Sequence, residues 1–170
     1  MLFRSSAGDL FEPSDARRAA LRRGTAEHAA YERIEWIDPA APKNALEARI
    51  LASGWREAFV RPPDAVALWR ERAFELVDGG AWVSGQFDRV VFAGEGEGRR
   101  AVIYDFKTNA RRRGESDEAL VARLEASYAG QMAAYRRSLS SLAGIPADRV
   151  ATRLLAAALL PPSAAAGFMV

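Results

Sequence analysis

The middle of the chain constrains its fold most strongly, because three strand-like runs follow one another with only short glycine-rich links between them. The runs cover residues 66–77, 81–92 and 101–108, and the links are Asp78-Gly79-Gly80 and the Gly-Glu-Gly-Glu-Gly sequence at 94–98. Links this short join antiparallel neighbours, whereas parallel strands need a crossover of about a dozen residues or more. We therefore predict an antiparallel meander over residues 66–108.

Helical patterns flank this meander on both sides. Ser14-Asp15, Thr25 and Asn44 are suitable N-caps for helices over 14–23, 25–36 and 45–52. A fourth helix covers 117–143, with a break near Gly130 as an open alternative. Residues 150–160 and 167–170 are predicted as strands, 1–13 as an irregular N-terminal segment and 37–42 as a loop. The expected fold class is α/β, with helices first, a hairpin sheet in the middle and a helix packed on it.

Composition excludes several classes of protein. The chain has 170 residues, a size suited to one domain, and it has no cysteine, which excludes disulfides, zinc–thiolate sites and iron–sulfur clusters. The longest apolar stretch, residues 154–160, is too short to span a bilayer, and the N-terminus lacks the apolar core of a secretory signal. No Gly-x-x-x-x-Gly-Lys-Ser/Thr sequence occurs, so ATP hydrolysis by a P-loop is excluded. We expect a cytoplasmic domain with no membrane contact.

The choice of basic residues is unusual and points to one position. Lysine and arginine together number 24, yet Lys43 and Lys107 are the two lysines of the chain. A lysine at 107, in a chain that otherwise uses arginine, suggests a need for a compact ammonium group whose pKa can shift.

Two acids accompany Lys107. Asp88 and Asp105 fall on neighbouring predicted strands, and Lys107 lies two residues past Asp105, on the same side of its strand. A carboxylate on a buried strand costs desolvation energy unless it is paired or bound to metal. The alternative is that these acids form structural salt bridges. Asp88 would then pair with Arg89 or another arginine, and Asp105 would pair with Lys107. Taken together, two carboxylates and an ammonium group favour a divalent cation and phosphodiester hydrolysis.

Clustered arginines suit contacts with phosphate, although the net charge is only +2. The clusters are at 17–18, 22–23, 99–100, 111–113 and 136–137. The triplet at 111–113 is the best candidate for DNA contact because it follows the strand that carries Asp105. Solvated helix faces are the alternative for any single cluster.

Five short motifs, in chain order, resemble the RecB-type branch of the PD-(D/E)XK nucleases, found at the C-terminus of bacterial helicase–nucleases. They are Arg22-Arg23-Gly24-Thr25-x-x-His28, Glu71-x-x-Phe74, Gly85-x-x-Asp88-Arg89, Tyr104-Asp105-Phe106-Lys107-Thr108 and Gln131-x-x-x-Tyr135. The resemblance covers about residues 20–160. It implies a restriction-endonuclease-like core, a mixed β-sheet flanked by helices. Residues 1–170 would then be a single nuclease domain with its core at about 14–160, a C-terminal fragment of a larger helicase–nuclease or a small partner for one.

The resemblance also implies a metal site. His28, Asp88, Asp105 and the backbone carbonyl of Phe106 would bind Mg²⁺ or Mn²⁺. Oxygen ligands suit Mg²⁺, and a histidine nitrogen shifts the preference slightly toward Mn²⁺. A lone histidine on an alanine-rich helix is usually structural, but the Gly24-Thr25 context favours a ligand here.

Other positions would serve catalysis, and DNA would be the substrate. Lys107 would orient or help deprotonate the attacking water. Gln131 and Tyr135, four residues apart, share one helix face and would approach the site. An acid at Glu71 would join them, with Glu75 on the same strand face as an open alternative.

The expected partners are DNA, entering as a single strand at a duplex end, and a helicase motor domain or subunit. Two other readings of the chain are a noncatalytic DNA-binding or docking module and a protein-interaction scaffold.

Overall fold

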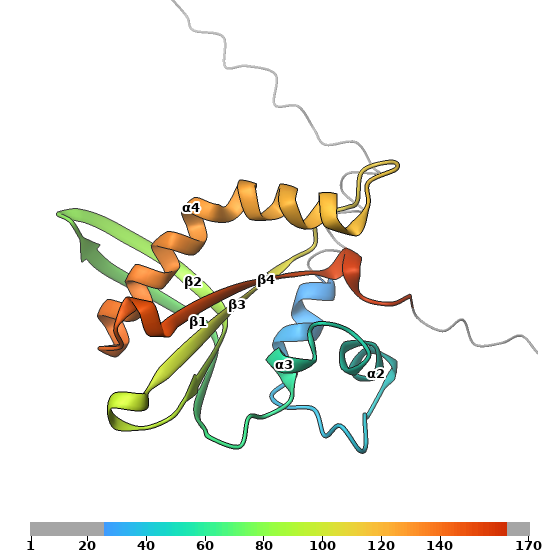
Figure 1. Ribbon diagram of the computed structural model, residues 1–170, viewed down its shortest axis with the longest axis horizontal. Helices are drawn as coiled ribbons and strands as arrows, with labels where there is room; N and C mark the ends of the chain where they lie inside the picture. Colours follow the sequence, from blue (N-terminus) through green and yellow to red (C-terminus); the bar gives the residue numbers. More distant parts are fainter. Residues whose placement is uncertain (1–25, 163–170) are drawn as a thin grey trace, which may run out of the picture.

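The computed structural model describes residues 26–162, and a mixed sheet of four strands lies at the centre of this part of the chain (Figure 1). The strands are β1 (Ala65–Asp78), β2 (Ala81–Ala93), β3 (Arg100–Lys107) and β4 (Val150–Ala156), in the spatial order β1-β2-β3-β4. The first three are antiparallel neighbours and β4 runs parallel to β3. The predicted meander is therefore confirmed, to within one residue at each strand end.

The last strand is shorter than predicted. It ends at Ala156 instead of residue 160, and Ala157–Leu159 form a 3₁₀ turn, η3. Ala156 pairs with Lys107, the last residue of β3, so the chain beyond it has no neighbouring strand to bond. Two further 3₁₀ turns are η1 (Gly96–Gly98) and η2 (Ala147–Arg149).

One long helix, α4 (Asp117–Ala143), links the parallel strands β3 and β4, with the bounds that the sequence predicted. Ser116 caps its start through a side-chain hydrogen bond from the amide of Ala119, and Gly144 ends it in the left-handed conformation. The helix is continuous through Gly130, so the alternative of a break there is wrong. A glycine in a helix interior costs only about 1 kcal/mol relative to alanine, which the surrounding helix formers offset.

The N-terminal helices gather on the opposite side of the sheet from α4 (Figure 1). Asn44 caps α2 (Ala45–Leu51) as predicted, and the four-residue α3 (Arg56–Phe59) was not predicted. A helix was expected over 25–36, and within the described residues it covers 26–32. It therefore ends four residues earlier than predicted, and the carbonyl groups of Ile34 and Glu35, just beyond its end, accept hydrogen bonds from Arg89. The predicted segments 1–13, 14–23 and 167–170 lie outside the described residues.

Each face of the sheet has its own apolar core. Against α4, the rings and aliphatic chains of Phe87, Val90 and Ile103 pack with Leu139. On the opposite face the buried residues include Tyr31, Phe59, Tyr104 and Phe106. Burial on both faces explains why residues 90–93 of β2 and 101–104 of β3 are continuous apolar runs. Within residues 26–162, no helix is long and apolar enough to cross a membrane.

Candidate functional site

The site begins where β2 and β3 stop pairing. Their last paired residues are Arg89 and Tyr104, and the next residues along the two strands are Asp88 and Asp105. Here the backbone amide of Phe106 donates to Oδ2 of Asp88 at 2.8 Å, in place of a backbone bond to β2. The separation of the strands therefore places Asp88 beside the part of β3 that carries Asp105.

The pairing of β1 with β2 is also interrupted at Asp88. Arg70 pairs with Arg89 and Arg72 with Phe87, so Glu71 and Asp88 stand opposite each other between them. Glu71 has a φ of 48°. Residues other than glycine rarely adopt this backbone conformation, which costs on the order of 1–3 kcal/mol. Strain of this kind, at the level of Asp88, is typical of a functional position.

Arg89 holds the sheet to the N-terminal helices. The side chain is only 1% exposed, and its Nε and Nη1 donate to the carbonyls of Ala58 and Ile34 at 2.7 and 2.9 Å. Its guanidinium also packs over the rings of Trp36 and Phe59. Burial lowers the pKa of Arg89 to about 10. Arg89 is thus bound to backbone carbonyls, and the alternative of an Asp88–Arg89 salt bridge is not what the structure shows.

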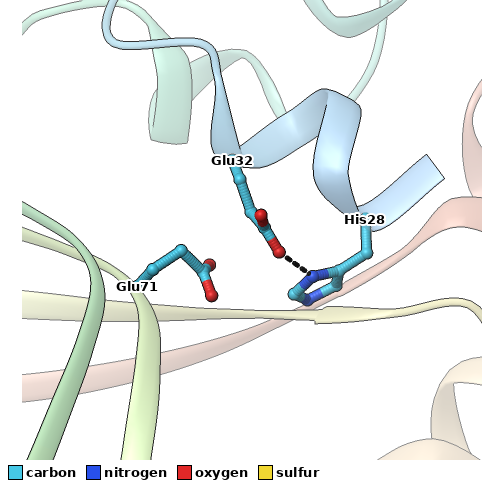
Figure 2. A group of neighbouring side chains, drawn as sticks. All are labelled: His28, Glu32 and Glu71. Carbon is cyan, nitrogen blue, oxygen red and sulfur yellow. Dashed lines mark hydrogen bonds and ion pairs between the residues drawn. The ribbon is translucent and has the colours of Figure 1, made fainter. Parts of the chain in front are cut away.

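His28 reaches the acids from the helix at 26–32. Its Nε2 lies 3.3 Å from Oδ2 of Asp88. Its Nδ1 lies 2.5 Å from Oε1 of Glu32, one turn later on the same helix (Figure 2). The ring packs edge-on against Phe106 with centroids 5.6 Å apart. The structure therefore brings His28 to Asp88 as predicted. Glu32 was missed, although its four-residue spacing from His28 was a usable signal.

Glu71 is the β1 acid that faces this group, not Glu75. His28, Glu32 and Glu71 each offer one ligand atom within 4.8 Å of the others (Figure 2). Gln86 donates to one oxygen of Glu71, and the other oxygen, Oε1, is buried without a hydrogen bond. Glu75 is exposed and pairs with Ser84 further along the hairpin.

Lys107 connects Asp105 to α4. The Lys107 side chain is 12% exposed, and its ammonium forms an ion pair with Oδ2 of Asp105 at 2.5 Å. It also donates to Oε1 of Gln131 at 3.3 Å, and Gln131 donates to the hydroxyl of Tyr135 at 3.0 Å. The predicted Gln131–Tyr135 pair is therefore in contact with Lys107 through a short hydrogen-bonded chain.

Tyr128 is a second residue that sequence reasoning left out of the site. The ammonium of Lys107 lies 3.9 Å from the centre of its ring, and its hydroxyl donates to Oδ1 of Asn109 at 3.1 Å. A cation over an aromatic face is attracted by the ring quadrupole. The spacing of three residues from Gln131 could have indicated a shared helix face.

Gly85 permits the close packing beside this chain of residues. A Cβ at this position would lie 2.7 Å from Cζ of Phe74 and 3.2 Å from Cε1 of Tyr135. Phe74 and Tyr135 in turn pack edge-to-face with centroids 5.7 Å apart. Gly85 is therefore required by a close approach and not by its backbone angles.

The donor set fits a divalent cation. His28, Glu32 and Glu71 form a group whose ligand atoms lie within 4.8 Å of one another, and Asp88 adjoins it at the Nε2 of His28. Oxygen-rich sets of this kind suit Mg²⁺ or Mn²⁺. Asp105 is only 2% exposed and its Oδ2 has the Lys107 ammonium as charge partner, whereas Oε1 of Glu71 is buried without a hydrogen bond. Burial raises the pKa of Asp105, and nearby Asp88 raises it further, against the opposing effect of Lys107. A cation would relieve the mutual repulsion of these acids.

The three arginines at 111–113 differ in the contacts of their side chains. Arg111 pairs with Asp117 at 2.5 Å and donates to the carbonyls of Glu115 and Ala158, so it fastens the loop before α4. Arg112 and Arg113 have exposed side chains on the same loop. The clusters at 17–18 and 22–23 lie outside the described residues, as does the Arg22-Arg23-Gly24-Thr25 part of the histidine motif.

Comparison with known proteins gives one match. The family model described as the PD-(D/E)XK nuclease superfamily matches residues 3–161, nearly the whole chain. Searches of curated proteins and of solved structures found no match.

Proposed function

The chain belongs to the PD-(D/E)XK nuclease superfamily, and from that premise we propose that it is a divalent-metal-dependent nuclease that hydrolyses phosphodiester bonds in DNA. The observation that carries this proposal is the convergence of Asp88, Asp105 and Lys107 where β2 and β3 separate. Superfamily members are generally metal-dependent nucleases, and the mixed four-stranded sheet agrees with their fold.

Asp88, Asp105, the carbonyl of Phe106 and His28 would hold the cation, with Glu71 close by. A bound Mg²⁺ or Mn²⁺ supplies positive charge to the phosphate and lowers the pKa of a coordinated water. Asp105 is buried, so its negative charge acts in a region of low dielectric, where it attracts a cation strongly.

Lys107 would act on the reacting groups from the other side of Asp105. Its ammonium can donate a hydrogen bond to the attacking water and offset the negative charge that develops as the phosphorus–oxygen bond to the leaving group breaks. Gln131 and Tyr128 restrict the lysine side chain, because one accepts a hydrogen bond from it and the other lies under it.

We further propose that the substrate is a single strand at a duplex end and that a helicase motor domain or subunit delivers it. The support for this finer assignment is the order of the five sequence motifs, which is that of the RecB-type branch. Arg112 and Arg113, on the loop that follows β3, have exposed side chains that could contact phosphates.

Release of nucleotides from linear single-stranded DNA in Mg²⁺ or Mn²⁺ tests the proposal. Wild-type protein should cleave, and Asp105→Asn and Lys107→Ala should each lose about 10²-fold or more of the rate. Asp148→Asn, an equal charge change at an exposed position, should cleave like wild type. Cleavage that survives both site substitutions would sink the assignment. Salt-dependent DNA binding without any metal-dependent cleavage would instead support a noncatalytic DNA-binding module.

A further inference from the structure

His28 lies between two carboxylates that contact different nitrogens of its ring. Nδ1 is 2.5 Å from Oε1 of Glu32, and Nε2 is 3.3 Å from Oδ2 of Asp88. An ionised carboxylate only accepts hydrogen bonds, so the nitrogen in the shorter contact, Nδ1, carries a proton. In the neutral ring this leaves the lone pair on Nε2, directed at Asp88.

We propose that Glu32 is a positioning residue, which holds the Nδ1–H of His28 so that Nε2 is presented to the cation shared with Asp88. This inference rests on the proposed function, because it assigns a role toward the same cation. A histidine that binds metal commonly donates its other ring N–H to a carboxylate or carbonyl, which fixes the tautomer and the ring orientation.

The helix explains why Glu32 can do this. Residues four apart lie on one face of a helix, so Glu32 and His28 approach the sheet from the same side (Figure 2). The C-terminal end of this helix is held in turn, because Arg70 of β1 donates to the carbonyls of Glu32 and Arg33 at 3.1 and 3.3 Å. The edge contact of the His28 ring with Phe106 further restricts its rotation.

A direct contact between Glu32 and the cation is the competing role. Its carboxylate is within 4.8 Å of the ligand atoms of both His28 and Glu71, which alone would allow it. The geometry favours positioning, because Oε1 of Glu32 is on the Nδ1 side of the ring and Asp88 is on the Nε2 side.

The tautomer can be read directly, since His28 is the single histidine of the chain. Nitrogen-15 NMR of the metal-free protein, at a pH where the ring is neutral, should show a protonated Nδ1 and an unprotonated Nε2. Glu32→Ala should shift the ring toward the Nε2–H form, which still has Asp88 as a partner. Glu27→Ala, an exposed position on the same helix with the same charge change, should leave the wild-type tautomer.

Calorimetric titration with Mn²⁺ separates the two roles of Glu32. Positioning predicts that Glu32→Ala weakens Mn²⁺ binding by about 10- to 100-fold. Glu32→Gln should lose much less, because its amide oxygen still accepts from Nδ1–H. Equal losses for both variants, with the tautomer kept in Glu32→Gln, would mean direct ligation and overturn the proposal. An unchanged tautomer and unchanged affinity in Glu32→Ala would also overturn it.

The same titrations distinguish failure of this inference from failure of the proposed function. Asp105→Asn should abolish Mn²⁺ binding if the acids hold the cation, whatever Glu32 does. Loss of binding in Asp105→Asn with no effect of Glu32→Ala refutes only the role of Glu32. Wild-type Mn²⁺ binding in Asp105→Asn refutes the metal site itself. The proposed role of Glu32 is then refuted as well, even if the tautomer shifts.

Discussion

The backbone amide of Phe106 donates a 2.8 Å hydrogen bond to Oδ2 of Asp88, so a carboxylate joins β2 and β3 at the level where their backbone pairing ends. This bond fixes Asp88 beside the strand that carries Asp105 and Lys107.

Lysine at position 107 should not be replaceable by arginine. The ammonium fits between Asp105, Gln131 and the ring of Tyr128, and a planar guanidinium is larger and has a different donor geometry. We expect Lys107→Arg to lower the cleavage rate by about 10²-fold or more despite its unchanged charge. Lys43→Arg, at an exposed position before α2, should cleave normally in the same assay. Near-normal cleavage by Lys107→Arg would argue against a specific role for the ammonium.

The ring of Tyr128 should matter more than its hydroxyl. Tyr128→Phe keeps the aromatic face under Lys107 and loses only the bond to Asn109. Tyr128→Leu removes the face, and a partly buried cation–π contact contributes on the order of 1–2 kcal/mol. We expect about a tenfold loss of cleavage rate in Tyr128→Leu and a small change in Tyr128→Phe. Equal losses in the two variants would assign the effect to the hydroxyl instead.

Two glycines should respond oppositely to alanine. Gly85→Ala would bring a Cβ within 2.7 Å of the Phe74 ring and 3.2 Å of Tyr135. Overpacking of this kind typically costs about 1–3 kcal/mol and here should also disturb the Tyr135–Gln131–Lys107 chain. Gly130→Ala, in α4 with nothing within 4 Å, should stabilise the fold by about 0.5–1 kcal/mol. Chemical denaturation of both variants, with cleavage assays on each, measures the contrast.

Mn²⁺ affinity should increase as pH rises, because protons compete for the ligands. Burial raises the pKa of both Asp105 and Glu71, so these acids ionise at higher pH than usual. Burial alone would lower the pKa of His28, but its contacts with Glu32 and Asp88 outweigh this and raise it. All three groups must lose their protons to bind metal. Because the pKa of each is raised, all three make Mn²⁺ binding tighter as the pH rises. Titration calorimetry from about pH 5.5 to about pH 8 should show the increase; a flat profile would contradict it.

The strands and the long helix could be predicted because their signals are local. Gly79-Gly80 makes a tight link, Ser116 and Gly144 bound α4, and the apolar runs mark buried strands. The parallel pairing of β4 with β3 was not predicted from the residues themselves. It depends on α4 returning the chain across the sheet, which is a long-range property.

The candidate site was likewise predicted only in part from the sequence. Asp88, Asp105 and Lys107 stood out because buried charge is costly and lysine is rare in this chain. Glu32 and Tyr128 did not, because a glutamate or a tyrosine on a helix is ordinary until its neighbours in space are known. The contact of Tyr128 with Lys107 joins α4 to β3, which the sequence does not bring together, whereas Glu32 and His28 share one helix and only their four-residue spacing was a signal.

Anomalous diffraction from crystals soaked in Mn²⁺ can show whether Asp88 and Asp105 share a cation, since it locates the ion without relying on activity. We expect an anomalous peak in contact with the carboxylates of both Asp88 and Asp105, beside the ammonium of Lys107. Crystals that take up Mn²⁺ only elsewhere, with these two acids still paired to protein groups alone, would contradict this expectation.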